Sequence, residues 1–515
     1  MSRAKRFASA LASGYLALAA NAIYTVLSIP LALHYLTREE FGLWAVVGQV
    51  TGYFALLDFG VGASVARILI DYKDNVNGGE YGATLKTASL FFVFQAVVIF
   101  FAGLFGGQLL AGLLQVPQHL HLAFQKLMFL QCCVAALSFL TTPFWLPLWS
   151  HQRSDLVNLT YVANFVVNGV VLWIGLQAGL RYYSLVLANL FGALVYIGST
   201  TSASFRFGLI PSSGHWGKIS VAKFREIFGF SRDVFVLQIA NQFISASQII
   251  LVSRLIGLDA AAVWSVCTKS FTLAQQIVFK IYDFANAGFS EMVVRRELAR
   301  FRDRLAQITS ITAVAAGLFA VMGACGNREL VYFWTSGKVT WAWEVDVAAA
   351  AYLFCTCVSR CYAGITGIFK QIGMFKYVSL LEGLLVVSGS LLLAPHLHFL
   401  GVFLAAIIAN VLCSGIYGIN FVAARFATSA STVTLGWITG AIRFIVFFSV
   451  LAALIFWVGL RFYNFPSFAL TAALAGVVGS WLGFQVGLGK NTRAELLAAG
   501  KKLVPKWETL HSQHS

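Results

Sequence analysis

Long stretches without a single charge limit how this chain can fold. Residues 90–105 and 162–176 contain no acidic or basic side chain, and similar apolar blocks recur between short basic segments. A membrane-spanning helix needs about 20 mostly apolar residues, because backbone groups in lipid must be satisfied within the segment. Charged residues are 11% of the chain and hydrophobic residues are 59%. The pattern predicts an all-α polytopic membrane protein and disfavours a barrel of short alternating strands.

The apolar blocks predict about fourteen spans, with both chain termini in the cytoplasm. This layout places most lysines and arginines of the connecting segments on the cytoplasmic side, as the positive-inside rule requires. The first block is too long for the core of a cleaved signal peptide, so we expect it to be retained. The predicted spans are residues 11–36, 41–66, 85–114, 122–149, 156–179, 182–205, 227–255, 260–292, 305–334, 345–369, 377–394, 401–424, 435–460 and 465–487.

The spans are expected to form two lobes of six helices, at residues 1–205 and 227–426. Residues 427–489 add two further helices, and residues 490–515 form a cytoplasmic tail. The linker at 206–226 places apolar residues among basic ones, which is typical of a helix lying on the membrane surface. The net charge of +16 is then explained by short cytoplasmic loops that face anionic headgroups. No soluble basic domain is left to bind nucleic acid.

The eight cysteines lie within or beside apolar segments, which favours a packing role over disulfides. Cys357 and Cys361 share one helix face, where a metal or redox pair is the alternative. A weak internal repeat is also present, because Asn21 and Trp44 recur as Asn241 and Trp264 with one common offset. This offset would give two repeats with the same orientation in the membrane. Parallel repeats of this kind are found in transporters.

A family resemblance begins in the first two spans. Asn21 and Pro30 are followed by Tyr-Leu-Thr-Arg-Glu-Glu-Phe-Gly-Leu-Trp at 35–44, and then by Gly-Tyr-Phe-Ala-Leu-Leu-Asp-Phe-Gly-Val-Gly-Ala at 52–63, closing with Arg67. Leu-Ile-Gly at 255–257, Val-Trp-Ser-Val at 263–266 and Phe-Ser-Glu at 289–291 follow in the second half. The chain resembles the polysaccharide transport family of Wzx-type O-antigen and exopolysaccharide flippases. An acidic residue that the family pattern places near Gln248 is missing.

The resemblance implies a V-shaped pair of lobes in the bacterial inner membrane. It also implies that the chain moves an undecaprenyl-pyrophosphate-linked oligosaccharide to the periplasmic leaflet by alternating access, for O-antigen, exopolysaccharide or capsule synthesis. The expected partners are this substrate, membrane lipids and the polysaccharide polymerase or chain-length machinery. We expect no enzymatic activity and no cofactor, and the chain has no Gly-Lys-Ser/Thr phosphate loop. Sodium ions, protons or the membrane potential are the alternatives for driving the cycle.

Ionisable residues inside predicted spans are candidates for function, because a charge in a bilayer is costly. Lys269, Gln276, Lys280 and Asp283 follow one another at steps of seven, four and three, which places them on one helical face. Such a stripe suits the wall of a wet cavity. We hypothesise that Lys269, Lys280 and Arg360 bind the pyrophosphate and that Gln276 binds sugar hydroxyls. The alternative is that Lys280 and Asp283 neutralise each other.

The remaining candidates each have two interpretations. Arg443 contacts a headgroup at the cavity entrance or extends to the interface. Asp58, followed by Gly60 and Gly62, binds a coupling cation or proton, or it accepts backbone hydrogen bonds at a bend. Glu382 is either a further buried carboxylate available for ion coupling or a solvated one near the start of its helix. Asp283 is either a carboxylate for ion coupling or the structural partner of Lys280.

Asn21 and Asn241 occupy equivalent places in the two halves. We expect them to form hydrogen bonds between helices rather than to contact substrate.

Two rival functions remain. A MATE-like, cation-coupled drug antiporter would favour acidic residues in its cavity, whereas buried bases here at least equal the acids. A membrane oligosaccharide polymerase or ligase would need a large external loop, and the longest external segment, at 327–344, is short and has no histidine.

Overall fold

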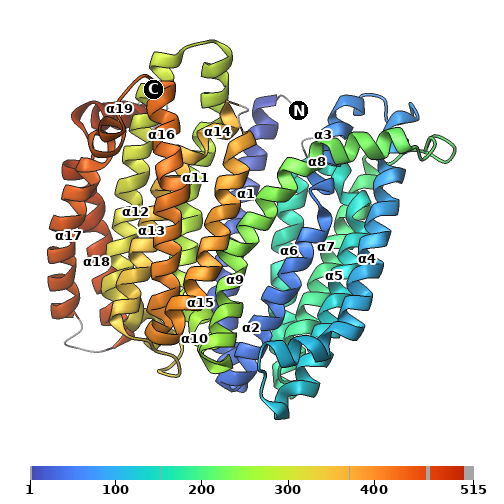
Figure 1. Cartoon of the computed structure of the whole chain (residues 1–515), viewed down its shortest axis with the longest axis horizontal. Coiled ribbons are helices and arrows are strands. Elements are labelled where there is room, and N and C mark those ends of the chain that lie inside the picture. Colours follow the sequence, from blue (N-terminus) through green and yellow to red (C-terminus); the bar gives the residue numbers. More distant parts are fainter. Residues whose placement is uncertain (1–2, 152, 370–371, 460–463, 504–515) are drawn as a thin grey trace, which may run out of the picture. The chain divides into compact units, whose positions relative to one another are not determined.

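The computed structural model describes residues 3–151, 153–369, 372–459 and 464–503. Every regular element within these ranges is a helix (Figure 1), which confirms the predicted class. Twelve helical segments are long and apolar enough to cross a membrane. The predicted tail is described as far as residue 503, and its remainder lies outside the described residues.

The first half of the chain forms ten α-helices, two 3₁₀ turns and one π-helical segment. In order they are α1 (Arg3–Tyr35), α2 (Arg38–Gly52), η1 (Tyr53–Asp58), α3 (Val61–Tyr72), α4 (Glu80–Leu113), η2 (Gln118–Leu120), α5 (His121–Ser150), α6 (Ser154–Gln177), α7 (Tyr183–Arg206), α8 (Val221–Asn241), π-helical η3 (Gln242–Ala246), α9 (Ser247–Leu255) and α10 (Leu258–Cys267).

In the second half, the described residues form further α-helices and three π-helical segments, η4, η5 and η7. In order they are α11 (Lys269–Val294), α12 (Leu298–Trp334), α13 (Trp343–Ala363), α14 (Ile365–Ile368), α15 (Ile372–Asn410), η4 (Val411–Gly415), α16 (Ile416–Arg425), η5 (Thr432–Gly436), α17 (Trp437–Gly459), α18 (Phe465–Leu482), η7 (Gly483–Gly487) and α19 (Lys490–Leu503).

Two of the fourteen predicted spans lie in one helical segment, Gly373–Arg425. His398 inside it has non-helical backbone angles (φ 51°, ψ −131°). A Cβ placed on Gly389 would lie 3.0 Å from the Cβ of Ala405, whereas sixteen residues of straight helix span about 24 Å. The chain therefore reverses near His398 and crosses twice, as the predicted spans 377–394 and 401–424 require.

The predicted span 260–292 is not one helix. It breaks at Thr268 into α10 and α11. At 1.5 Å per residue, α11 alone is about 39 Å long, which is enough to cross a bilayer. α11 is not among the twelve apolar segments, because the polar and charged residues along its length leave no comparably apolar stretch. With this helix and the two crossings of Gly373–Arg425, the described residues account for the fourteen predicted crossings.

The predicted span 41–66 is also interrupted. The apolar segment ends at Asp58, and α3 is a separate helix beyond a turn at Phe59 and Gly60. Phe59 has φ 49° and Gly60 has φ 74°, so the turn uses two consecutive left-handed residues. Glycine adopts this conformation without the steric cost that a side chain adds.

Helices cluster into two compact units. The first contains Met1–Cys267, Trp334–Thr340 and Ser379–Ala405, and the second contains Thr268–Phe333, Trp341–Val378 and Ala406–Ser515. In the first unit, α4 packs on α5, α6 on α7 and α1 on α6 (Figure 1). In the second, α11 packs on α13, α13 on α16 and α17 on α18. The division into two six-helix lobes stays a prediction.

The weak repeat in the sequence coincides with helix ends. α1 ends at Tyr35 and α9 at Leu255, and α2 begins at Arg38 and α10 at Leu258, so both pairs are 220 residues apart. The two equivalent helices α2 and α10 pack on each other. A Cβ on Gly42 would lie 3.3 Å from the backbone nitrogen of Ala262, its equivalent in the repeat. Contact between equivalent positions is what a two-fold relation between two helices produces.

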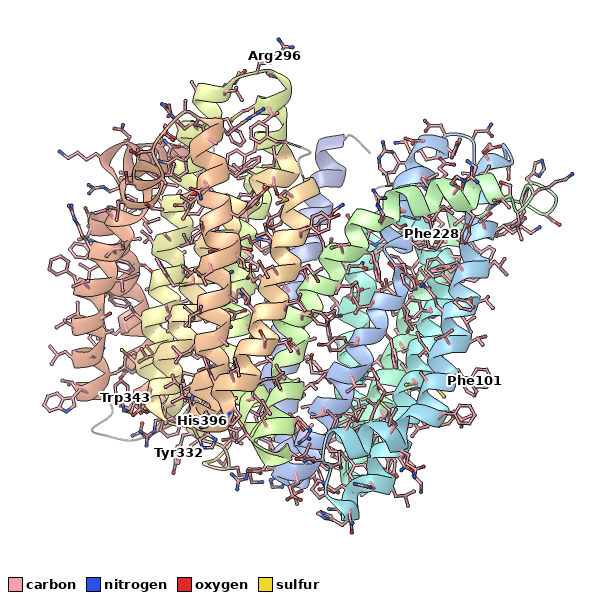
Figure 2. The ribbon with its side chains drawn as sticks, in the orientation of Figure 1. Phe101, Phe228, Arg296, Tyr332, Trp343 and His396 are labelled. Atoms are coloured by element: carbon pink, nitrogen blue, oxygen red, sulfur yellow. The ribbon has the colours of Figure 1, made fainter. Side chains whose placement is uncertain are left out.

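Helix α12 crosses the whole second unit. Figure 2 shows Arg296 in the turn that precedes it, and Tyr332 and Trp343 at the opposite end of this unit. Side chains of tryptophan and tyrosine prefer membrane interfaces, and arginines favour the cytoplasmic side. The two ends of the second unit therefore have the chemistry of opposite interfaces.

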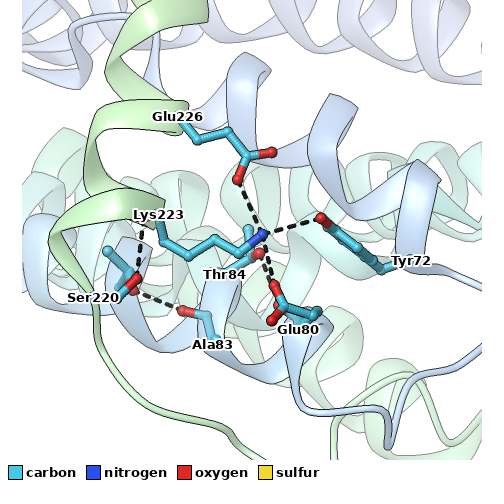
Figure 3. A network of polar contacts seen from close by, with 8 residues as sticks. Tyr72, Glu80, Ala83, Thr84, Ser220, Lys223 and Glu226 are labelled. Atoms are coloured by element: carbon cyan, nitrogen blue, oxygen red, sulfur yellow. Dashed lines mark hydrogen bonds and ion pairs between the residues drawn. The ribbon is translucent and has the colours of Figure 1, made fainter.

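The linker at 206–226 is attached to the first unit. The Tyr81 hydroxyl donates to the Leu209 carbonyl at 3.1 Å. Further along, Lys223 contacts Glu80 at 2.9 Å, Glu226 at 3.0 Å and the Tyr72 hydroxyl at 3.1 Å (Figure 3). Burial opposes the charge on Lys223, but these hydrogen bonds outweigh it and raise the pKa of its ammonium group. α8 begins inside the predicted linker and continues past it without a break, and the surface location of its first turns stays a prediction.

A proline in α1 creates a backbone acceptor that the rest of the first unit satisfies. Pro30 has no N–H, so the Val26 carbonyl lacks its usual partner four residues later. The indole N–H of Trp334 donates to that carbonyl at 2.6 Å. The ammonium of Lys338 donates to the Leu33 carbonyl in the last turn of the same helix. The segment after α12 thus completes the hydrogen bonding of α1.

Replacing Trp334 by phenylalanine should destabilise the protein by about 1 kcal/mol, because the Val26 carbonyl loses its donor. In a Pro30→Ala background the same change should have little effect, because the new N–H at position 30 reaches Val26. Thermal unfolding in lipid nanodiscs measures both. Trp343→Phe, at a residue that is 59% exposed, is the control. An equal loss in both backgrounds would contradict this account.

Candidate functional site

The candidate site is centred on α11 in the second unit. This helix is continuous from Lys269 to Val294, so the steps between Lys269, Gln276, Lys280 and Asp283 place these residues on one face, as predicted. α11 packs against α13, which carries Arg360. The polar face of a membrane-spanning helix thus lies beside a second helix that contributes a cation.

Three of the predicted residues form an ion cluster. Nη2 of Arg360 lies 2.7 Å from Oδ1 of Asp283, and Nζ of Lys280 lies 3.9 Å from Oδ2 of the same carboxylate. The Arg360 guanidinium also lies over the Phe279 ring, 4.4 Å from its centroid. Between 34% and 48% of each charged side chain is exposed. The cluster therefore carries two positive charges and one negative charge and is open to an incoming group.

The net positive charge of this cluster determines what it can bind. One carboxylate cannot neutralise two cations, and a charge inside a membrane protein is less screened than one in water. Arginine offers a planar fork of donors that matches phosphate oxygens, and lysine adds a point charge. The cluster is suited to an anion with several oxygens.

Lys269 does not join this cluster. Eleven residues of helix place it about 17 Å along the axis from Lys280, a separation much longer than a pyrophosphate group. Its side chain is partly buried, and within the described part of the chain it has no hydrogen bond or ion pair. Gln276 lies between the two lysines and is partly buried. The structure thus brings together Lys280, Asp283 and Arg360 and leaves Lys269 at a second position on the same face.

The other charged candidates lie elsewhere. Arg443 is exposed on α17 of the second unit and makes no contact with the cluster. Glu382 belongs to the first unit, is the eleventh residue of α15 and is 2% exposed. It is therefore not solvated near a helix start, because α15 begins earlier than the predicted span.

Asp58 ends the 3₁₀ turn η1 in the first unit. Its carboxylate accepts the Gly62 N–H at 3.1 and 3.3 Å. This contact satisfies one of the donors that the first turn of α3 leaves without a helical partner. Such backbone bonds at a bend are one of the two interpretations offered for Asp58, and they leave room for a further ligand.

Asn21 is partly buried and Asn241 is exposed, and the hydrogen bonds of the described residues involve neither side chain. Other amides join helices instead. The Tyr24 hydroxyl donates to Asn168 at 2.7 Å, and Asn168 donates to Asn189 at 3.0 Å. The expected role of Asn21 and Asn241 between helices stays a prediction.

Sequence reasoning also missed a buried acid in the second unit. Asp346 is 1% exposed and accepts hydrogen bonds from Asn327 at 2.6 Å and from the Trp341 indole at 2.8 Å. It lies near the start of its predicted span and so resembled an interfacial residue. The buried thiols Cys357 and Cys361 are free, and Cys361 contacts the Cys357 carbonyl at 3.7 Å. No cluster of three or more metal ligands occurs in the described residues.

Apolar helices of membrane-spanning length define a multi-pass α-helical membrane protein, and an ion cluster joins two of its helices, α11 and α13. Residues 9–286, more than half of the chain, match the family described as polysaccharide biosynthesis protein. The chain belongs to that family, as its opening motifs predicted. No curated protein matches the chain.

Solved structures share its fold. The lipid II flippase MurJ in an inward closed conformation is 13% identical, with 90% of this chain and 98% of that chain covered and a TM-score of 0.63. An inward-facing MATE family multidrug resistance transporter of the MOP superfamily is 13% identical, with 79% and 95% covered and a TM-score of 0.63. A MOP superfamily transporter from Pyrococcus furiosus is 13% identical, with 80% and 96% covered and a TM-score of 0.53. Identity this low shows the fold alone.

A double-mutant cycle on Asp283→Asn and Arg360→Gln should give a coupling energy of about 1 kcal/mol, because both side chains are partly exposed. Thermal unfolding of the four variants measures it. The matched control is the exposed pair Glu297 and Arg300, 3.1 Å apart, for which we expect about 0.3 kcal/mol. Coupling no larger than that of the control would mean that the cluster does not form.

Proposed function

We propose that the protein is a flippase for an undecaprenyl-pyrophosphate-linked oligosaccharide, acting in O-antigen, exopolysaccharide or capsule synthesis. The observation that carries the proposal is the net positive cluster of Lys280, Asp283 and Arg360 beside a membrane-spanning helix. Membership of the polysaccharide biosynthesis family and the fold shared with a lipid II flippase support it. The substrate moves from the cytoplasmic to the periplasmic leaflet by alternating access.

The cluster binds the pyrophosphate by exchange of partners. Without cargo, Asp283 pairs with Arg360 and keeps its charge compensated. A pyrophosphate then replaces the carboxylate at Arg360 and also contacts Lys280, so that no cation is left unpaired at any step. Gln276 and its neighbours bind sugar hydroxyls. Lys269, about 17 Å further along the helix, serves a different part of the cargo or a later point on its path.

The chain lies in the bacterial inner membrane with both termini in the cytoplasm. The turn between α11 and α12 supports this orientation, because Arg295, Arg296 and Arg300 are exposed there and Trp343 is exposed at the other end of the second unit. Polysaccharide polymerase or chain-length machinery would receive the exported unit.

A MATE-like drug antiporter is the second candidate, and the shared fold supports it. Its cationic cargo would need the carboxylate of Asp283 rather than the two bases. A polymerase or ligase is a weaker candidate, because the segment between α12 and α13, at 335–342, is short and two of its side chains, Lys338 and Trp341, are hydrogen-bonded within the protein.

Deleting the gene should trap the lipid-linked oligosaccharide on the cytoplasmic leaflet, which leaflet-resolved labelling of the undecaprenyl-linked pool measures. In complemented cells, Lys280→Gln and Arg360→Gln should each lower export about tenfold or more, because each removes a charge-assisted contact of at least about 1.4 kcal/mol. Arg300→Gln is the control and should export normally. Normal arrival at the periplasmic leaflet in the deletion strain would refute the proposal.

Asp283→Asn distinguishes anionic from cationic cargo. The cluster then carries two positive charges, so export of an anionic lipid should persist at no less than about a third of the normal rate, whereas transport of a cationic drug should be abolished. Parallel assays of oligosaccharide export and cationic dye efflux measure the two. Loss of efflux with unchanged oligosaccharide export in the deletion strain would favour the antiporter.

A further inference from the structure

We propose that the turn at Asp58 is a binding site for a monovalent cation, and specifically for sodium. The site lies in the first unit, whereas the cluster on α11 belongs to the second, and it is built from three side chains on three elements. Asp58 comes from η1, Gln95 from α4 and Gln238 from α8. As the coupling site of the flippase, it rests on the proposed function, but its binding chemistry can be tested without the substrate.

A break in a membrane-spanning segment provides the framework. η1 ends at Asp58, Phe59 and Gly60 adopt left-handed angles, and α3 begins at Val61. The end of a helix exposes carbonyl groups and carries partial negative charge. Unwound backbone and helix carboxyl ends inside a membrane are suited to bind small cations.

Two amide side chains converge on this turn. The Gln95 amide nitrogen donates to the Leu57 carbonyl, and the Gln238 amide approaches Asp58 closely enough to stabilise its charge. Both donors are thereby directed at the turn. Gln95 is 1% exposed. The Oε1 atoms of Gln95 and Gln238 are both buried, and neither has a hydrogen-bond partner among the described residues.

Burying a polar atom without a partner costs about 1–3 kcal/mol, and two of the eleven such side-chain atoms in the described residues belong to the glutamines beside this turn. A cation offers the interaction that these two oxygens lack. The carboxylate adds a third ligand, since the Gly62 N–H occupies only part of its acceptor capacity. Hard cations take oxygen ligands of this kind, from carboxylates, amides and backbone carbonyls.

The charge balance selects a monovalent ion. No lysine or arginine in the described part of the chain pairs with Asp58, and Arg67, on the following helix, is paired with Asp71 at 2.7 Å. The three side chains together carry one negative charge. A sodium ion neutralises it, whereas a divalent cation would leave an excess charge inside the membrane protein, which is costly.

The test uses the full-length protein in nanodiscs without substrate. Binding of radioactive sodium and thermal unfolding are measured in sodium chloride and in choline chloride of equal ionic strength. Sodium should raise the melting temperature in a saturable way, because a ligand that binds the folded state stabilises it. Asp58→Asn should abolish saturable binding, and Gln238→Leu should weaken it about tenfold, since each removes a ligand.

Asparagine at position 58 retains a side-chain oxygen for the Gly62 N–H, so the start of α3 should survive the change. Asp71→Asn is the matched control, because it neutralises an exposed carboxylate (61% exposed) one helix away, and it should bind sodium normally. Gln238→Leu keeps the proposal testable if Asp58→Asn does not fold.

Absence of saturable sodium binding to the normal protein would overturn the proposal, and so would unchanged binding in Asp58→Asn and Gln238→Leu. A melting temperature that depends on pH but not on sodium would mean that Asp58 takes a proton, and would overturn it too. Export of oligosaccharide is a separate measurement. Sodium binding that is lost in Asp58→Asn supports the site even where the export assay contradicts the flippase.

Discussion

Within a bilayer no water is available to satisfy a backbone group, and three places in the described residues where a helix is interrupted or changes its hydrogen bonding have a specific partner. Pro30 leaves the Val26 carbonyl without a donor, and Trp334 supplies one. The break after Asp58 leaves amide groups at the start of α3, and the carboxylate accepts one of them. Gln242, at the start of a π-helical segment, donates to the Gly52 carbonyl at 2.8 Å. At these breaks, the polar side chains form hydrogen bonds with backbone groups that would otherwise lack a partner.

This constraint separates the charges that maintain the fold from those available for transport. Asp58 satisfies backbone and still retains acceptor capacity. The ammonium group of Lys223 is engaged in the contacts that attach the linker to the first unit. Lys280, in contrast, lies in the middle of the continuous helix α11, and Arg360 lies in the last turn of α13 with its side chain bonded to Asp283 rather than to backbone. Their only described ionic partner is Asp283. A pair of cations that shares one carboxylate keeps an attraction for a second anion.

The number and order of the crossings were predictable from sequence, because the length of an apolar run fixes whether a helix can span. The reversal near His398 was marked by Pro395 and by the polar residues around it. A bend at Asp58 was one of the two interpretations that its neighbouring glycines offered, whereas the break at Thr268 was not predicted, because it does not interrupt the apolar pattern. The partners of the turn at Asp58, Gln95 and Gln238, lie far from it in the sequence.

The candidate site was predictable in part for the same reason. Spacing alone places Lys280 and Asp283 on one face, since helical periodicity is local. The closer pairing of Arg360 with Asp283, at 2.7 Å against 3.9 Å for Lys280, depends on how α13 packs on α11. Hydrophobic pattern contains no information on that packing.

What the repeat conserves is the placement of helix ends. α1 and α9 end, and α2 and α10 begin, at equivalent positions, and the small residues Gly42 and Ala262 let the two helices approach closely. The polar residues at equivalent positions differ in environment, as Asn21 and Asn241 do. The two halves thus share the positions of these helix ends but not their polar residues. The first half has a break at Asp58, and the second has a charged face on α11. The proposed sodium site and the proposed pyrophosphate site therefore share no residue, and each can be altered without changing the side chains of the other.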